Sequence, residues 1–250
     1  MEKTLTTLLT HQAPECVLRM WEHWRQERSS QEILVLYGGT RENFSKLGDI
    51  NAVFVEDQRL RTRDHCNEFQ SYIGVFQEIS RYLKRNPNVF SWVFFAEFDV
   101  LPLRPFPELE ARYLETLHRQ NADAIFRLIY ECQGSGQDVY QQHARLPGFH
   151  DYWQSMTVRP DPRTVLWALT PGSFWKAEVI LDIADIPEPF PIYFEIWLPT
   201  VTHHRGWRVR PMEDNKFKIH GGGALDDQIA AAREEGCHVI HPVKRAWLSL

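Results

Sequence analysis

The first hundred residues alternate short apolar runs with amphipathic segments. Strand-like runs occupy residues 4–11, 32–39 and 51–57, and the stretch SWVFFAEFDVLPL at residues 91–103 supplies a fourth. Between them, apolar residues at helical spacing predict one helix that Pro14 opens and a second whose apolar face runs from Phe69 to Leu83. Buried strands that alternate with such helices predict an α/β fold, with a mainly parallel sheet covered by helices on both faces.

The pattern loosens beyond Leu103, where prolines interrupt the chain. We expect a helix over about residues 108–120, a strand over 122–130 and a long polar loop over 133–152. Residues 164–175 predict a strand that meets a Pro-Gly turn, and residues 193–206 predict a helix in which His203 and His204 form a surface pair. A helix (DDQIAAAREEG) and a strand (CHVIHPVK) follow. No stretch reads as a linker, so we expect a single domain over residues 1–250.

Composition excludes several classes of protein. The 250 residues are 43% hydrophobic, which is enough for a large core, and a net charge of −5 offers no basic surface for nucleic acid. The four cysteines form no Cys-x-x-Cys pair, so they predict reduced thiols rather than a zinc site or a disulfide scaffold. The N-terminus lacks a signal-peptide pattern, and no apolar run approaches the roughly 20 residues of a membrane span. These features predict a cytoplasmic protein without a transmembrane segment.

Two carboxylates lie at the end of the most apolar predicted strand. Glu97 and Asp99 are two residues apart, so in a strand they point to the same face. The carboxyl ends of parallel strands are where open α/β sheets bind ligands. Close carboxylates repel one another unless a cation or a shared proton compensates them, and Mg²⁺ or Mn²⁺ accepts such oxygen ligands. The stretch therefore indicates either a divalent metal site or a solvated polar strand end.

The ordered runs TTLLTH, EILVLYGG, AVFVED and SWVFFAEFDVLPL resemble the nucleotide-binding half of a GT-A fold glycosyltransferase. In that superfamily an Asp-x-Asp motif at the end of the corresponding strand holds a metal against a nucleotide-sugar diphosphate. Here the motif is EFD, so the resemblance implies Glu97 and Asp99 as metal ligands. It also implies a Rossmann-like sheet, with residues 1–103 as the nucleotide-sugar-binding half and residues 104–250 as the acceptor-binding and catalytic half.

Three later segments resemble further parts of the superfamily pattern. TPGSFW matches a glycine-containing turn before the acceptor site and implies Gly172 and Ser173. YFEIWLP matches the helix start that supplies the catalytic base and implies Glu195, although a single acid stands where a pair is usual. HPVK matches a C-terminal histidine that helps to hold the metal, which implies His241 with Lys244 beside the diphosphate.

Residues at the other predicted strand ends are placed to contact the nucleotide. We expect contacts with base and ribose from Thr10, His11, Tyr37, Gly38 and Asp57. Arg61 and Arg63, in RLRTRD, either contact phosphate or belong to a solvated run of charged residues. The function that the resemblance implies is metal-dependent transfer of a sugar from a nucleotide-diphosphate donor to a saccharide or other hydroxyl acceptor, with Mn²⁺ or Mg²⁺ as cofactor. Two alternatives stay open: a nucleotidyltransferase of related fold, and a non-catalytic relative that binds nucleotide or carbohydrate.

Overall fold

A computed structural model of the chain describes residues 3–26, 32–56, 69–133, 138–186, 189–213 and 216–243. The helices of these ranges are α1 (Pro14–Arg25), α2 (Arg41–Phe44), α3 (Phe69–Arg85), α4 (Phe106–Gln120), α5 (Asp138–Ala144), α6 (Phe149–Met156), α7 (Ala177–Ile183), α8 (Phe194–His204) and α9 (Asp226–Glu234). The strands are β1 (Thr4–Thr10), β2 (Ile33–Tyr37), β3 (Ala52–Phe54), β4 (Trp92–Glu97), β5 (Leu101–Pro102), β6 (Ala124–Phe126), β7 (Ile129–Glu131), β8 (Leu166–Ala168), β9 (Ser173–Lys176), β10 (Val209–Pro211), β11 (Phe217–Ile219) and β12 (Val239–His241).

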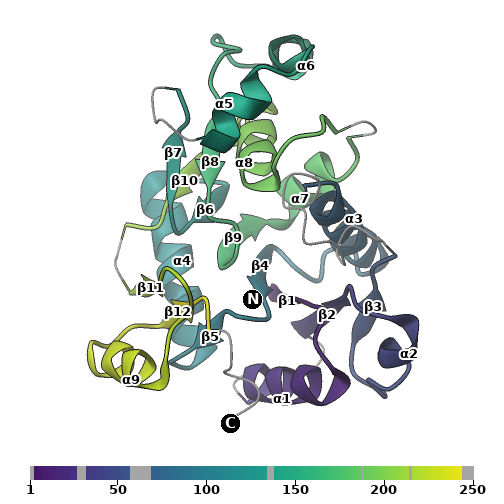
Figure 1. Ribbon diagram of the computed structural model, residues 1–250, viewed down its shortest axis with the longest axis vertical. Coiled ribbons are helices and arrows are strands. Elements are labelled where there is room, and N and C mark those ends of the chain that lie inside the picture. The colour runs from purple at the N-terminus through teal and green to yellow at the C-terminus, as the bar shows by residue number, and fades with distance from the viewer. Residues whose placement is uncertain are drawn as a thin grey trace.

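The central sheet has seven strands in the order β10-β6-β9-β4-β1-β2-β3 (Figure 1). Every neighbouring pair is parallel except those that include β9, which runs against both β4 and β6. The strands β1, β2 and β4 are almost wholly buried, as apolar runs in a sheet covered on both faces should be. The expected mainly parallel α/β sheet is confirmed.

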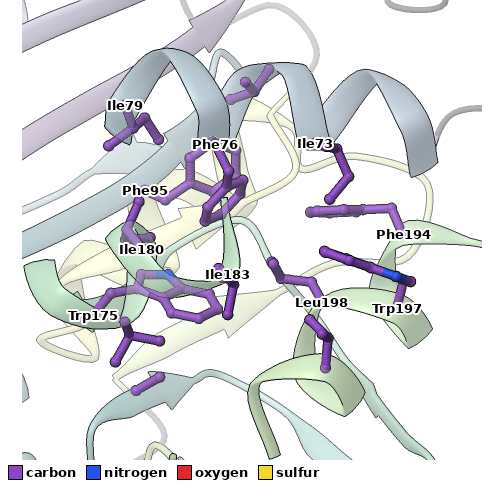
Figure 2. Close-up of a cluster of buried hydrophobic side chains, with 14 of the residues drawn as sticks. Ile73, Phe76, Ile79, Phe95, Trp175, Ile180, Ile183, Phe194, Trp197 and Leu198 are labelled. Atoms are coloured by element: carbon purple, nitrogen blue, oxygen red, sulfur yellow. The ribbon is translucent and has the colours of Figure 1, made fainter. Parts of the chain in front are cut away.

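Two apolar cores lie on opposite faces of this sheet. One joins the sheet to α3, α7 and α8, and the other joins it to α1, α4 and α9. In the first core, Phe76 of α3 contacts Phe95 and Trp175, with ring centroids 5.4 and 5.6 Å apart (Figure 2). Phe194 and Trp197 bring α8 into the same cluster. The first turn of α8 is therefore fixed against the sheet by buried aromatic rings.

A second, three-stranded sheet has the order β11-β12-β5. β12 runs parallel to β11 and antiparallel to β5, with Val239 opposite Pro102 and Ile240 opposite Leu101. β5 begins two residues after Asp99. Its pairing with β12 therefore places residues 239–241 next to the end of β4. The sequence did not predict this small sheet.

β7 and β8 pair as a separate antiparallel sheet next to α8 (Figure 1). The expected single strand over residues 122–130 is thus wrong, because it divides into β6 and β7 around Arg127 and Leu128. The Nε atom of Arg127 donates a hydrogen bond of 2.6 Å to the carbonyl of Phe217, which holds the bend. The chain leaves the central sheet there, and β7 takes β8 as its partner.

Two other expectations are wrong. The range 133–152 contains α5 and the first half of α6, so it is not one long loop. His204 is 0% exposed, so the histidines are not a surface pair. The ring of His204 bonds to the hydroxyl of Thr157 and the carbonyl of Thr164, both at 2.8 Å, which satisfies both ring nitrogens inside the protein.

Two findings on membrane spans and cysteines apply to the described ranges. Every helix there is too short or too polar to cross a bilayer. The cysteines at positions 16, 132 and 237 are buried free thiols.

Candidate active site

The carboxyl ends of β1, β2 and β4 meet at one edge of the central sheet. Glu97, the last residue of β4, is in register with Leu9 of β1. Just beyond, the exposed ring of His11 meets Phe98 edge-on, with centroids 4.9 Å apart. Phe98, which lies between Glu97 and Asp99, therefore contacts the end of β1. This contact places the expected nucleotide-binding residue His11 next to the expected metal ligands.

Asp99 and His241 lie together at this edge. The Oδ1 atom of Asp99 is 3.3 Å from Nε2 of His241, and the two side chains are 16% and 11% exposed. The backbone N–H of Val243 donates to the carbonyl of Asp99 at 2.9 Å, which continues the tie between β5 and β12. The structure thus brings together two residues that the sequence analysis proposed as metal ligands.

Glu195 lies in the first turn of α8, partly buried. The hydroxyl of Tyr193 donates to its Oε2 atom at 3.0 Å. Burial raises the pKa of Glu195 to about 7, although the hydrogen bond from Tyr193, the charge of His241 and the neighbouring polar groups of Trp167 and Thr170 act in the opposite direction. A carboxyl group with a pKa near neutrality can give or take a proton at physiological pH.

Electrostatic coupling links His241 to three carboxylates. Burial alone would lower the pKa of His241, but the negative charges of Asp99, Glu97 and Glu195 raise it above its usual value. The positive charge on His241 in turn lowers the pKa of Glu195. Glu97, Asp99, Glu195 and His241 therefore form one electrostatic group at the edge of the sheet.

The donor atoms of this group fit part of a divalent-cation site. No cluster of three or more His, Cys, Asp or Glu side chains within the described ranges is arranged to hold a metal ion by itself. Oδ1 of Asp99 is nevertheless buried without a hydrogen bond from any described residue, and an imidazole nitrogen faces it. Mg²⁺ commonly takes one or two carboxylates and completes its shell with substrate phosphates and water. Asp99 and His241 fit that arrangement as two ligands.

Gly172 has a conformational role in the turn between β8 and β9. Its φ angle is +79°, and an added Cβ would lie 2.0 Å from a ring carbon of Phe217. Its N–H donates to the carbonyl of Phe95 at 2.8 Å, and its own carbonyl accepts a hydrogen bond from Tyr113. Position 172 requires glycine both for its backbone conformation and for the close packing of Phe217. The glycine of TPG therefore has a structural reason that does not depend on a ligand.

Other expected substrate contacts lie inside the protein. Ser173 is 0% exposed, and its hydroxyl accepts a hydrogen bond of 2.7 Å from the indole of Trp175. Tyr37 is also 0% exposed, and its hydroxyl donates to the carbonyl of Gln12 at 3.0 Å. Thr10 is 1% exposed, and its hydroxyl accepts from the N–H of Gln12 at 3.2 Å. These three side chains build the strand ends and do not offer free polar atoms to a ligand.

Gly38 is buried directly after β2, with its N–H bonded to the carbonyl of Thr10 at 2.8 Å. It therefore positions the neighbouring strand ends. Asp57, Arg63 and Lys244 lie outside the described residues, as does Arg61.

Sequence reasoning missed the aromatic side chains around Glu195. Tyr193, the residue before α8, donates a hydrogen bond to its carboxylate, and Trp167 of β8 lies close enough to lower its pKa. Tyr130 of β7 stacks on Trp167, with centroids 4.9 Å apart. The nearness of Tyr193 is visible in the sequence YFE, but the approach of Trp167 depends on how β8 packs against α8.

No known family profile and no curated protein matches the sequence. Among solved structures, the apo form of the bifunctional glycosyltransferase WbbM matches with a TM-score of 0.50 and 13% identity, over 96% of this chain and 45% of that chain. The chain thus spans less than half the length of WbbM.

Two further solved structures are similar over 84% of this chain. Core-mannan synthase A from Aspergillus fumigatus, in a Mn/GDP form, has a TM-score of 0.42 and 9% identity over 72% of its own length. A cytidylyltransferase from Leptospira borgpetersenii has a TM-score of 0.43 and 11% identity over 76% of its length. The likeness to WbbM, together with the strand order, shows a GT-A-like fold.

Proposed function

We propose that the protein is a metal-dependent glycosyltransferase, which moves a sugar from a nucleoside-diphosphate donor to an acceptor hydroxyl. The observation that carries the proposal is the meeting of Asp99 and His241 at 3.3 Å, in an electrostatic group that also holds Glu195 with a pKa of about 7. Such a group offers a cation site for a diphosphate and a proton acceptor for a hydroxyl. The fold of the chain supports the same reaction class.

Asp99 and His241 would hold Mn²⁺ or Mg²⁺, with Glu97 at the rim of the site. When bound, the metal neutralises the charge that gathers on the departing diphosphate. His11, exposed and in contact with Phe98, lies where the nucleotide would enter over the end of β1. Gly38 keeps the backbone of β2 close to β1, and we propose Asp57, Arg63 and Lys244 as further donor contacts.

Glu195 would take the proton from the acceptor hydroxyl. The hydrogen bond from Tyr193 orients the carboxylate, so it is held ready before the acceptor arrives. The partly buried position excludes some water and keeps the carboxylate basic enough to accept a proton near pH 7. A base of this kind typically contributes about 10²–10⁴-fold in rate.

Calorimetric titration of UDP and GDP, each with and without Mn²⁺, tests the donor site. We expect manganese-dependent binding of one nucleotide to the wild type and its loss in Asp99→Ala. The matched control is Asp227→Ala, which changes an exposed carboxylate on α9. If neither nucleotide binds with or without Mn²⁺, the proposed donor class is wrong. Turnover of a nucleoside triphosphate with a sugar 1-phosphate would instead identify a nucleotidyltransferase.

A further inference from the structure

The two-stranded sheet of β7 and β8 carries a stacked aromatic pair. Tyr130 and Trp167 are directly opposite one another in the β-sheet register. Their ring centroids are 4.9 Å apart, and their planes meet at 28°. Both residues are only partly buried, whereas Trp153 and Trp197 nearby are 0% and 1% exposed. The pair therefore keeps some aromatic surface open beside α8.

The position of this pair relative to Glu195 is fixed by hydrogen bonds. The hydroxyl of Thr200 on α8 accepts from the N–H of Leu166 at 2.9 Å and donates to the carbonyl of the same residue at 3.0 Å. This double contact holds β8 against the helix that carries Glu195, and Figure 1 shows the two elements side by side. The aromatic surface is thereby set in place before any ligand binds.

The side chain of Trp167 also lies close enough to the carboxylate of Glu195 to lower its pKa. A single ring is thus near the proposed base and has one face in the stack with Tyr130. The hydroxyl of Tyr193 donates to the same carboxylate, at 3.0 Å. The base is therefore flanked by rings, an arrangement that suits a ligand with an apolar face and a hydroxyl at its edge.

We infer that Tyr130 and Trp167 form the acceptor subsite, and that the acceptor is a saccharide whose pyranose ring packs on this aromatic surface. The inference rests on the proposed function and specifies its acceptor class. A pyranose has a face of C–H groups that packs on an aromatic ring, and hydroxyls around its edge that can reach Glu195. A serine hydroxyl of a protein or a simple alkyl alcohol has no such face and gains little from the stacked pair.

Saturation-transfer NMR on the wild type tests the contact without relying on a variant. The probes are methyl glycosides of glucose, galactose, mannose and N-acetylglucosamine, with cyclohexanol as a comparator that has an apolar ring and one hydroxyl. Irradiation of aromatic protons should transfer to the ring C–H protons of at least one glycoside more than to its methyl group. Cyclohexanol that competes equally with every glycoside would overturn the inference.

Steady-state kinetics on three variants separates stacking from other effects. Tyr130→Leu should raise the acceptor KM about tenfold and leave the nucleotide Kd unchanged, because it removes a ring from the subsite. Tyr130→Phe, which keeps the ring, should stay within about twofold of the wild type in KM. Trp21→Leu is the control, since Trp21 is another partly buried tryptophan, placed on α1. A Tyr130→Leu variant with an unchanged acceptor KM overturns the inference.

The two proposals fail separately. Manganese-dependent nucleotide binding without any glycoside contact would overturn the acceptor subsite and leave the donor site standing. Glycoside contact that Tyr130→Leu abolishes, in a protein that binds no nucleotide, would support a saccharide site at Tyr130 and Trp167 and overturn the glycosyltransferase proposal.

Discussion

The imidazole of His241 lies 3.3 Å from the carboxylate of Asp99, although one residue ends β12 and the other follows β4. The pairing of β12 with β5 and the hydrogen bond from Val243 to the carbonyl of Asp99 hold the two segments in register. The contact between the side chains therefore rests on a backbone scaffold and not on their charges alone. Either side chain can be changed without removing the hydrogen bonds that place it.

His241→Gln should weaken manganese-dependent nucleotide binding by at least about 10–100-fold, because it removes an imidazole nitrogen from the cation site. Binding of the nucleotide without Mn²⁺ should change little. Calorimetric titration with both metal conditions measures the difference. The control is His150→Gln, an exposed histidine on α6. Unchanged manganese dependence in His241→Gln would place the cation elsewhere.

Glu195→Gln should lower kcat by about 10²–10⁴-fold and leave nucleotide affinity intact, because the amide cannot accept the acceptor's proton. In the wild type, a pKa of about 7 means that the basic form gains population as pH rises through neutrality. Activity should therefore increase across that range, and the increase should vanish in the variant. A pH–rate profile of kcat measures both.

Glu178→Gln is the matched control for Glu195→Gln, since Glu178 is an exposed acid in the first turn of α7. An acid in a first turn that only complements the helix dipole contributes about 0.3–1 kcal/mol to stability and nothing to catalysis. Equal kcat values for Glu178→Gln and Glu195→Gln would reduce Glu195 to that role.

Asp123→Asn should destabilise the fold by about 3–5 kcal/mol, because it breaks a buried ion-pair network. Asp123 is 3% exposed and contacts Lys176 Nζ at 2.6 Å and Arg208 Nε at 2.9 Å. Burial alone would raise the pKa of Asp123, but hydrogen bonds from Arg208 and Lys176 hold it well below its usual range. Its stabilising effect is thus fully present above about pH 4 and is lost as pH falls further.

Urea denaturation at pH 7 and pH 3 measures the effect of Asp123→Asn. The difference in unfolding free energy between the wild type and the variant should be smaller at pH 3. Asp161→Asn is the control, because Asp161 pairs with Arg163 at the protein surface and should change little at either pH. A difference for Asp123→Asn that does not depend on pH would contradict the ion-pair explanation.

Gly172→Ala should destabilise the protein by about 2–4 kcal/mol, since it adds backbone strain at φ +79° to a clash with Phe217. Gly48→Ala separates the backbone strain from the clash. Gly48 has a φ angle of +66°, but an added Cβ there would meet nothing within 4 Å. Thermal unfolding should show a clearly smaller loss for Gly48→Ala. Equal losses would mean that Phe217 moves aside at no cost.

The sequence predicted the parts of this fold that depend on local periodicity. The central sheet and the helix layer over it were predicted from the apolar runs at β1, β2 and β4 and from the apolar face of α3. The motif EFD predicted that the candidate site lies at the end of β4. The region 133–152 was misread because its short helices are mostly polar. Phe149 and Trp153, four residues apart on α6, are the apolar pair that the helix buries.

Contacts between distant segments were beyond the reach of sequence patterns. Nothing local to Trp167 indicates that it lies near Glu195, since its placement depends on the hydrogen bonds that hold β8 to α8. The burial of His204 likewise depends on partners at Thr157 and Thr164. Asp99 and His241 could be named as candidates from a resemblance, but their meeting is a product of the β5–β12 pairing.

That pairing has a consequence for the order of events during synthesis. Domains fold from the N-terminal end as the ribosome extends the chain, and the central strands β1, β2 and β4 are made early. β12 supplies His241 only after the central strands and all the described helices have been translated. A nascent chain can therefore bury its main core while the proposed cation site still lacks its histidine, so manganese-dependent nucleotide binding should arise only after β12 has been translated.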